Sequence, residues 1–171
     1  MLQSNSNKRL AIRSSIPHHY NCKELIISIE GGNVKMKILV CTDGSDHSTR
    51  AVRWAAQFAK NYSSELMILN VVKNIVKTDG EIAWFKEEDE EGNRILSEAK
   101  LLVEKEFQGV KVTLRLAGGD ADKVTVELAE NEKLDLIVMG SRGLGQFKRL
   151  LLGSISQKVS THAPCPVTIV R

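Results

Sequence analysis

Apolar and polar residues follow two different spacings along most of the chain, and together they predict alternating strands and helices. Short apolar runs at 38–41, 66–72 and 134–139 indicate strands that are covered on both faces. Strict alternation over 110–116 instead predicts a strand with one face in water, which places it at an edge of a sheet. A last short strand is expected at 167–170.

Between these strands, apolar residues recur every three or four positions, as on one face of an amphipathic helix. Four helices are expected: one capped by Ser45 or Asp46, one starting in the acidic run 87–91, one over 120–133 and one over 154–162. Strands and helices therefore alternate from Met36 onward. This order requires a parallel sheet with helices on both faces.

The predicted fold class is α/β, with an open five-stranded parallel sheet. Right-handed crossovers and the exposed third strand suit the strand order 3-2-1-4-5. In that order the winding reverses between strands one and four, and ligands bind beyond the carboxyl ends of those strands. The loops at this point are 42–45 and 140–154, so we expect the functional site between them.

Residues 1–35 show no sustained period, so we expect a flexible extension that is not native, with Met36 as the true start. One domain is expected over 36–171. The composition, 42% hydrophobic and 26% charged, is that of a soluble globular protein. A net charge of +3 and 5% aromatic residues give no signature of nucleic-acid binding. No stretch reaches the roughly 18 apolar residues that cross a membrane. We therefore expect a cytoplasmic protein with neither nucleic acid nor membrane as a partner. The sequence also contains an insertion at 73–91, for which it predicts no role.

Glycines gather after the fourth predicted strand and again before the last helix. They are Gly140, Gly143, Gly145 and Gly153. Glycine lets the backbone approach a ligand closely, and the N–H groups of a helix N-terminus then face that ligand and favour negative charge. Ser154 and Ser156 add hydroxyl groups and Arg142 adds a cation, so the loop suits a triphosphate. A valine at Gly140 or Gly153 is expected to abolish binding of this triphosphate without unfolding the domain.

The spacing Gly-x2-Gly-x9-Gly-Ser, from Gly140 to Ser154, is neither a P-loop nor a dinucleotide-binding fingerprint. It resembles the ATP-binding signature of the universal stress protein family. The first loop (42–45), the stretch 135–143 and the ending 162–167 resemble that family as well, and the resemblance covers 36–171. It implies a Rossmann-like fold, similar to that of the adenine nucleotide alpha hydrolases, and an ATP-binding regulatory protein of the stress response.

The resemblance also implies a role for each matching residue. Asp43 would reach the ribose or adenine side of the nucleotide, and this carboxylate could also bind Mg²⁺ held by the phosphates. Cys41, where the family often has proline or alanine, and Val71 would line the adenine. The remaining nucleotide contacts would be Thr42, Met139, Gly140, Arg142, Gly143, Gly153, Ser154, Ile155 and Ser156. The expected ligand is ATP, or AMP in its place, with Mg²⁺ bound alongside ATP.

No nucleophile, orienting base and set of charge clamps of the kind that phosphoryl transfer needs is visible. We therefore expect a nucleotide-dependent homodimeric switch with slow hydrolysis at most. The alternatives are a slow ATPase or nucleotidyl-transfer enzyme of the same superfold, and a ligand-free adaptor. The last strand, from Val167 to Arg171, leaves an apolar edge that predicts pairing with a second copy, and the resemblance implies the same homodimer. The sequence does not specify a signalling partner.

Overall fold

The computed structural model describes the greater part of the expected domain. The described residues are 35–72, 75–76, 82–83, 86–144 and 152–171. The expected N-terminal extension, apart from Lys35, lies outside the described residues, as does the Trp84-Phe85 pair of the insertion. Within the described part, no helix is long and apolar enough to cross a membrane.

Five parallel strands form the central sheet in the order β5-β2-β1-β6-β7. Their bounds are β1 Lys37–Cys41, β2 Glu65–Val72, β5 Lys111–Gly118, β6 Leu136–Gly140 and β7 Val167–Val170. Counted along the chain as the five predicted strands, this is the order 3-2-1-4-5, so the predicted fold class is confirmed. β5 lies at one edge of the described sheet, as its alternating sequence predicted.

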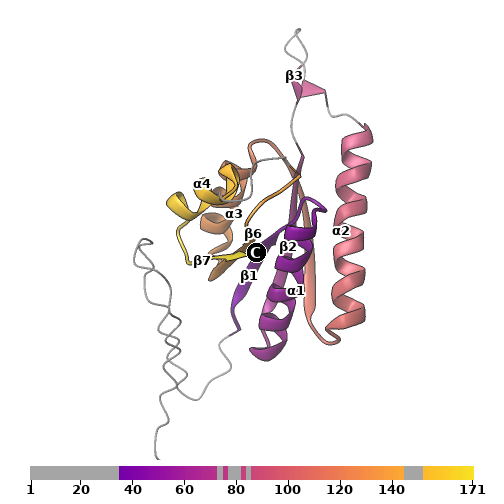
Figure 1. Cartoon of the computed structure of the whole chain (residues 1–171), viewed down its shortest axis with the longest axis vertical. Coiled ribbons are helices and arrows are strands. Elements are labelled where there is room, and N and C mark those ends of the chain that lie inside the picture. Colours follow the sequence, from indigo (N-terminus) through magenta and orange to yellow (C-terminus); the bar gives the residue numbers. More distant parts are fainter. Residues whose placement is uncertain (1–34, 73–74, 77–81, 84–85, 145–151) are drawn as a thin grey trace, which may run out of the picture.

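Helices cover both faces of the sheet (Figure 1). The helices are α1 Asp46–Asn61, α2 Lys86–Glu106, α3 Ala121–Glu132 and α4 Ser154–His162. α1 and α2 pack on one face, and α3 and α4 lie together on the other. The Ser45 side chain caps α1 by accepting a hydrogen bond from the Ser48 N–H, which satisfies one of the free donors of the first turn.

The expected insertion at 73–91 is shorter than its sequence indicated, because α2 already begins at Lys86. A small antiparallel pair, β3 Ile75–Val76 and β4 Ile82–Ala83, lies between β2 and α2 and was not predicted. Each of these strands has only two residues, which is too short for a periodic pattern to indicate it.

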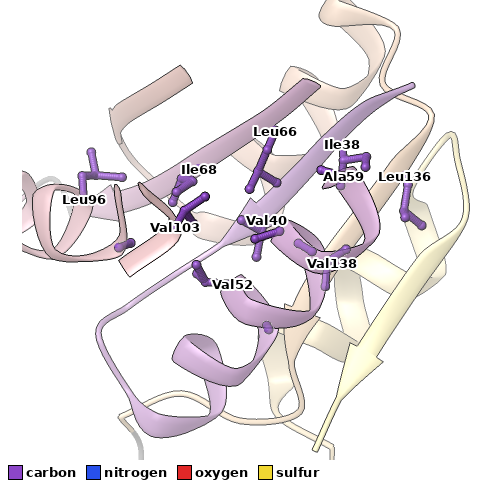
Figure 2. Packing of buried hydrophobic residues seen from close by; sticks show 14 residues of the cluster. Ile38, Val40, Val52, Ala59, Leu66, Ile68, Leu96, Val103, Leu136 and Val138 are labelled. Atoms are coloured by element: carbon purple, nitrogen blue, oxygen red, sulfur yellow. The ribbon is translucent and has the colours of Figure 1, made fainter. Parts of the chain in front are cut away.

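The hydrophobic core consists of two layers, one on each face of the sheet. Ile38 and Val40 of β1 face α1 and α2, whereas Leu39 between them faces α3 and α4, as the two-residue period of a strand requires. Figure 2 shows the first layer, in which Val52 of α1 and Val103 of α2 point toward the strands. Full burial of one side chain of this size stabilises the fold by about 1.5–3 kcal/mol.

Small residues bring α1 close to the sheet. Its buried face carries Ala51, Ala55, Ala56 and Ala59, each at most 1% exposed. Alanine keeps the helix axis near the strands, so the first turn of α1 lies directly against the end of β6. This close packing determines the geometry of the site described next.

Candidate functional site

The carboxyl ends of β1 and β6 are neighbours in the sheet, and the loops that follow them face each other there. This is the position at which the strand order reverses, where open α/β sheets bind their ligands. The loop 42–45 follows β1 and leads into α1. The glycine loop, defined here as residues 140–144 and 152–153, follows β6 and leads to α4; its remaining residues, 145–151, lie outside the described part.

Buried hydrogen bonds hold the loop after β1 in place. The Asn70 side chain of β2 donates to the Thr42 carbonyl oxygen at 2.8 Å, and the Thr42 N–H donates to Leu69 O at 2.9 Å. The hydroxyl groups of Thr42 and Ser48 lie 3.1 Å apart and hydrogen-bond each other. Thr42, Ser48 and Asn70 are all buried, so these polar groups stabilise one conformation of the loop.

Asp43 connects the two loops through its carboxylate. Oδ1 accepts a hydrogen bond from the Ser45 N–H at 3.1 Å, and Oδ2 accepts one from the Leu144 N–H at 3.0 Å. A Cβ atom at Gly143 would overlap Asp43 Oδ2, so only glycine leaves room for the carboxylate in this position. Asp43 and Gly143, which the sequence placed on opposite sides of the crevice, are therefore in direct contact.

Gly140 lies against the backbone of α1. A Cβ atom built there would be 2.8 Å from His47 C and 2.9 Å from both His47 O and Ser48 N. A valine at this position would force β6 and α1 apart, so Gly140→Val should destabilise the domain as well as alter the loop, which the sequence did not indicate. At Gly153 a Cβ atom would be no closer than 3.3 Å to its nearest neighbour, Ser156 Oγ, so the expectation remains reasonable there.

Ser141 links three elements around the glycine loop. Its N–H donates to the carbonyl oxygen of Val170 in β7 at 2.7 Å, and its own carbonyl oxygen accepts from the Gly153 N–H at 2.9 Å. Its hydroxyl lies 3.3 Å from Nδ1 of His47 in the first turn of α1. Ser141 is only 6% exposed, so its own side of these three contacts is shielded from water.

The N-terminus of α4 follows Gly153, which provides no side-chain cap. Ser154 and Ile155 are exposed in the first turn, whereas Ser156 is buried and its hydroxyl donates to Gly153 O at 3.0 Å. Because an uncapped helix start presents backbone N–H groups and the positive end of the helix dipole, this end of α4 suits an anion. Arg142 is half-buried and lies near this end of α4, because a Cβ atom built at Gly153 would be 3.5 Å from the Arg142 Cα.

The side of the crevice expected to hold adenine is formed by β1, β2 and α3. Cys41 ends β1, and its Sγ lies 3.6 Å from the Thr125 hydroxyl of α3. Burial raises the pKa of the Cys41 thiol to about 11, and the hydrogen bond with Thr125 opposes this only in part, so the thiol is protonated at neutral pH. Val71 is half-buried at the end of β2, whereas Met139 is 6% exposed and belongs to the core below.

The structure thus brings the residues predicted from sequence to one edge of the sheet. It also adds residues that sequence reasoning missed, chiefly His47, Asn70 and Thr125. His47 could have been found from the sequence, because it lies in the first turn of the helix that begins where the strand order reverses. Asn70 stood out as the polar residue in an apolar strand, but its partner was not evident from the sequence.

Two further observations concern what else this region could hold. A cavity of about 170 Å³ lies between α1 and α2, and its walls include Thr42, Gly44, Ile95 and Glu98 but no residue of the glycine loop. The cavity thus shares the loop after β1 with the crevice, but its walls include none of the described residues of the glycine loop. Among the described residues, no group of three or more histidine, cysteine, aspartate or glutamate side chains could hold a metal ion.

Comparisons with known proteins identify similar chains. Residues 36–171 match the model of the universal stress protein family. Universal stress protein MJ0531 of Methanocaldococcus jannaschii is 36% identical over 146 residues, which are 82% of this chain and 85% of that protein. Universal stress protein YxiE of Bacillus subtilis is 36% identical over 148 residues, covering 79% of this chain and 98% of the relative.

Solved structures are similar over the same region. A universal stress protein crystallised in complex with cAMP is 29% identical, with a TM-score of 0.61, over 80% of this chain and 97% of that one. The universal stress protein of Archaeoglobus fulgidus in complex with dAMP is 21% identical, with a TM-score of 0.63, over 81% and 99% of the two chains. The second likeness shows the fold alone.

Proposed function

Because this chain belongs to the universal stress protein family, we propose that it is an ATP-binding regulatory protein that acts as a nucleotide-dependent homodimeric switch. The observation that carries the proposal is the uncapped N-terminus of α4. It lies across from Asp43, at the position where the strand order reverses. The relative solved with cAMP supports an adenine nucleotide as the ligand class. AMP is the natural competitor, since it would use the same adenine and ribose contacts.

The proposed ligand lies along the crevice with its adenine near Cys41 and Val71 and its ribose near Asp43. Its phosphates face the backbone N–H groups at the start of α4, where the helix dipole stabilises negative charge. The residues present fit this group: the phosphate end offers donors without a competing side-chain cap, and the opposite end is apolar. Mg²⁺ would be held by the phosphate oxygens, and each oxygen of Asp43 retains acceptor capacity beyond its present hydrogen bond.

Slow hydrolysis is the runner-up activity, and one measurement separates it from binding alone. Phosphoryl transfer requires a positioned nucleophile and charge clamps around the transferred group, in addition to a binding site. In a single-turnover experiment with labelled Mg-ATP, we expect the bound ATP to remain unhydrolysed for many minutes. Rapid magnesium-dependent release of phosphate would instead favour the ATPase.

The proposed homodimer forms through β7, the edge strand opposite β5. Its four residues are half-buried, and the far side of β7 has no partner strand in the described sheet. An open edge of this kind favours pairing with another chain. The hydrogen bond from Ser141 to Val170 supports the switch, because it joins the glycine loop to this strand.

An aromatic row on α1 supports the same interface. Trp54 stacks on Phe58, with ring centroids 5.2 Å apart, and Phe58 contacts Tyr62 at 4.6 Å. The preceding residue, Arg53, hydrogen-bonds Glu106 of α2, so the row turns away from α2 and toward the side of the sheet where α1 contacts β7. Trp54 is 38% exposed and offers apolar area beside the open strand edge.

Titration calorimetry on nucleotide-free protein tests the proposal. We expect one ATP per chain, loss of binding in Gly153→Val, and unchanged binding in the matched control Ser97→Ala, whose hydroxyl contacts only its own helix. Absence of binding heat at millimolar ATP in the wild-type protein would contradict the function. Light scattering after gel filtration tests the dimer, and a monomer at all concentrations with and without ATP would contradict the switch.

A further inference from the structure

A histidine of α1 contacts the glycine loop from the side opposite to α4. His47 Nδ1 lies 3.3 Å from the Ser141 hydroxyl and 2.8 Å from NH2 of Arg50. The backbone of His47 also packs directly against Gly140, so its ring is held at a fixed distance from the loop. His47 is half-buried, and the Ser141 side of this contact is shielded from water.

The arginine determines which way these hydrogen bonds run. A guanidinium group has only donors, so Nδ1 of His47 must accept the hydrogen bond from Arg50. Because Nδ1 carries no proton in this arrangement, the Ser141 hydroxyl also donates to it and shares its single lone pair with Arg50. This direction fixes the rotation of the serine side chain.

Ser141 transmits this contact to the start of α4. Its carbonyl oxygen accepts the N–H of Gly153, the residue immediately before the first turn whose N–H groups face the proposed phosphates. The loop after β1 and the first turn of α1 thus each hold the glycine loop at one point, Asp43 to Leu144 and His47 to Ser141. Only the first involves a group that the proposed nucleotide would contact, so the second persists when a ligand engages Asp43.

We propose that His47, acting through Ser141, is a positioning residue that fixes the phosphate end of the nucleotide site. The inference rests on the proposed nucleotide binding and adds to it a residue that does not touch the ligand. Its consequence is selective: loss of the contact displaces the start of α4, which faces the phosphates, and leaves the adenine side formed by Cys41 and Val71 unchanged.

The test compares ATP with adenosine, which lacks phosphate groups, by calorimetry on the full chain. His47→Ala and Ser141→Ala should each weaken ATP binding by about 3–10-fold, the net effect of one hydrogen bond, and leave adenosine binding within about twofold. His47→Asn should restore ATP binding, because the Asn Oδ1 accepts in the place of Nδ1. His162→Ala, at the far end of α4, is the matched control and should bind both ligands normally.

Each outcome decides a different point. Selective loss of ATP affinity with rescue by asparagine supports the proposal. Equal loss for ATP and adenosine, failure of the asparagine rescue, or no loss at all overturns it while leaving the proposed function intact. If the wild-type protein binds neither ligand, the proposed function is overturned and this inference with it. Thermal melting of every variant without ligand shows whether a loss of affinity follows from unfolding.

Discussion

Replacing Gly140 by alanine tests how closely α1 packs against the end of β6. The added methyl group would lie 2.8–2.9 Å from three backbone atoms of His47 and Ser48. Carbon atoms in favourable contact are about 3.5–4.0 Å apart, so strand and helix must separate by roughly 0.5–1 Å. No side-chain rotation relieves this overlap, because the atoms that it meets belong to the backbone of a helix.

The expected magnitude follows from two opposing terms. Overpacking of this kind costs about 1–3 kcal/mol, whereas replacing glycine by alanine restricts the unfolded chain and returns about 0.4–1 kcal/mol. The net loss in free energy of unfolding should be about 1–2 kcal/mol, with a fall in Tm of about 3–10 °C. Gly153→Ala, whose nearest contact is 3.3 Å, is the control and should lose less.

Urea denaturation followed by circular dichroism measures this loss. We expect a lower midpoint with an unchanged slope, because the same surface is exposed on unfolding. A Gly140→Ala protein as stable as the wild type would refute the close packing of α1 on β6. It would also remove the geometric basis for the contact between His47 and the glycine loop.

Three further predictions concern the same region. Gly143→Ala should displace the Asp43 carboxylate and weaken ATP binding about tenfold or more without lowering Tm, and calorimetry with unchanged affinity would contradict this. Asn70→Leu should cost about 1–3 kcal/mol of stability in urea, because the buried Thr42 carbonyl loses its donor; an unaltered midpoint would show that this donor is dispensable. Cys41, with its pKa raised from 9.0 to about 11, should react with iodoacetamide at pH 8 about 100-fold more slowly than an ordinary thiol and faster as the pH approaches 11, which peptide mass spectrometry can follow.

The sheet and its order could be predicted because each strand carried its own signal. Alternation over 110–116 placed β5 at an edge, and continuous apolar runs placed β1, β2 and β6 inside the sheet. The resemblance drawn from the glycine spacing is confirmed at the level of the family. The β3–β4 pair escaped prediction, since two-residue strands leave no period to recognise.

The contacts within the site depend on pairs far apart in the chain, and periodicity contains no information about them. Asp43 and Leu144 are 101 residues apart, yet the carboxylate accepts the Leu144 N–H. The direction of the hydrogen bond between Arg50 and His47 is evident only once both side chains are placed. The contacts of Ser141 likewise depend on β7, the last strand along the chain, whose Val170 carbonyl oxygen accepts the Ser141 N–H.

The hydrogen bond between Asp43 and the Leu144 N–H has a thermodynamic consequence for any nucleotide that uses this carboxylate. This hydrogen bond already holds the two loops together in the folded protein. Their conformational entropy is therefore lost when the protein folds and is not lost again when the ligand binds. A ribose hydroxyl that donates to Asp43 Oδ2 shares or replaces an existing hydrogen bond, and the enthalpy gained is smaller than a count of contacts in the complex would suggest. For such a nucleotide, affinity at this end of the crevice would depend more on the preorganised loops than on the enthalpy of a new hydrogen bond at Asp43.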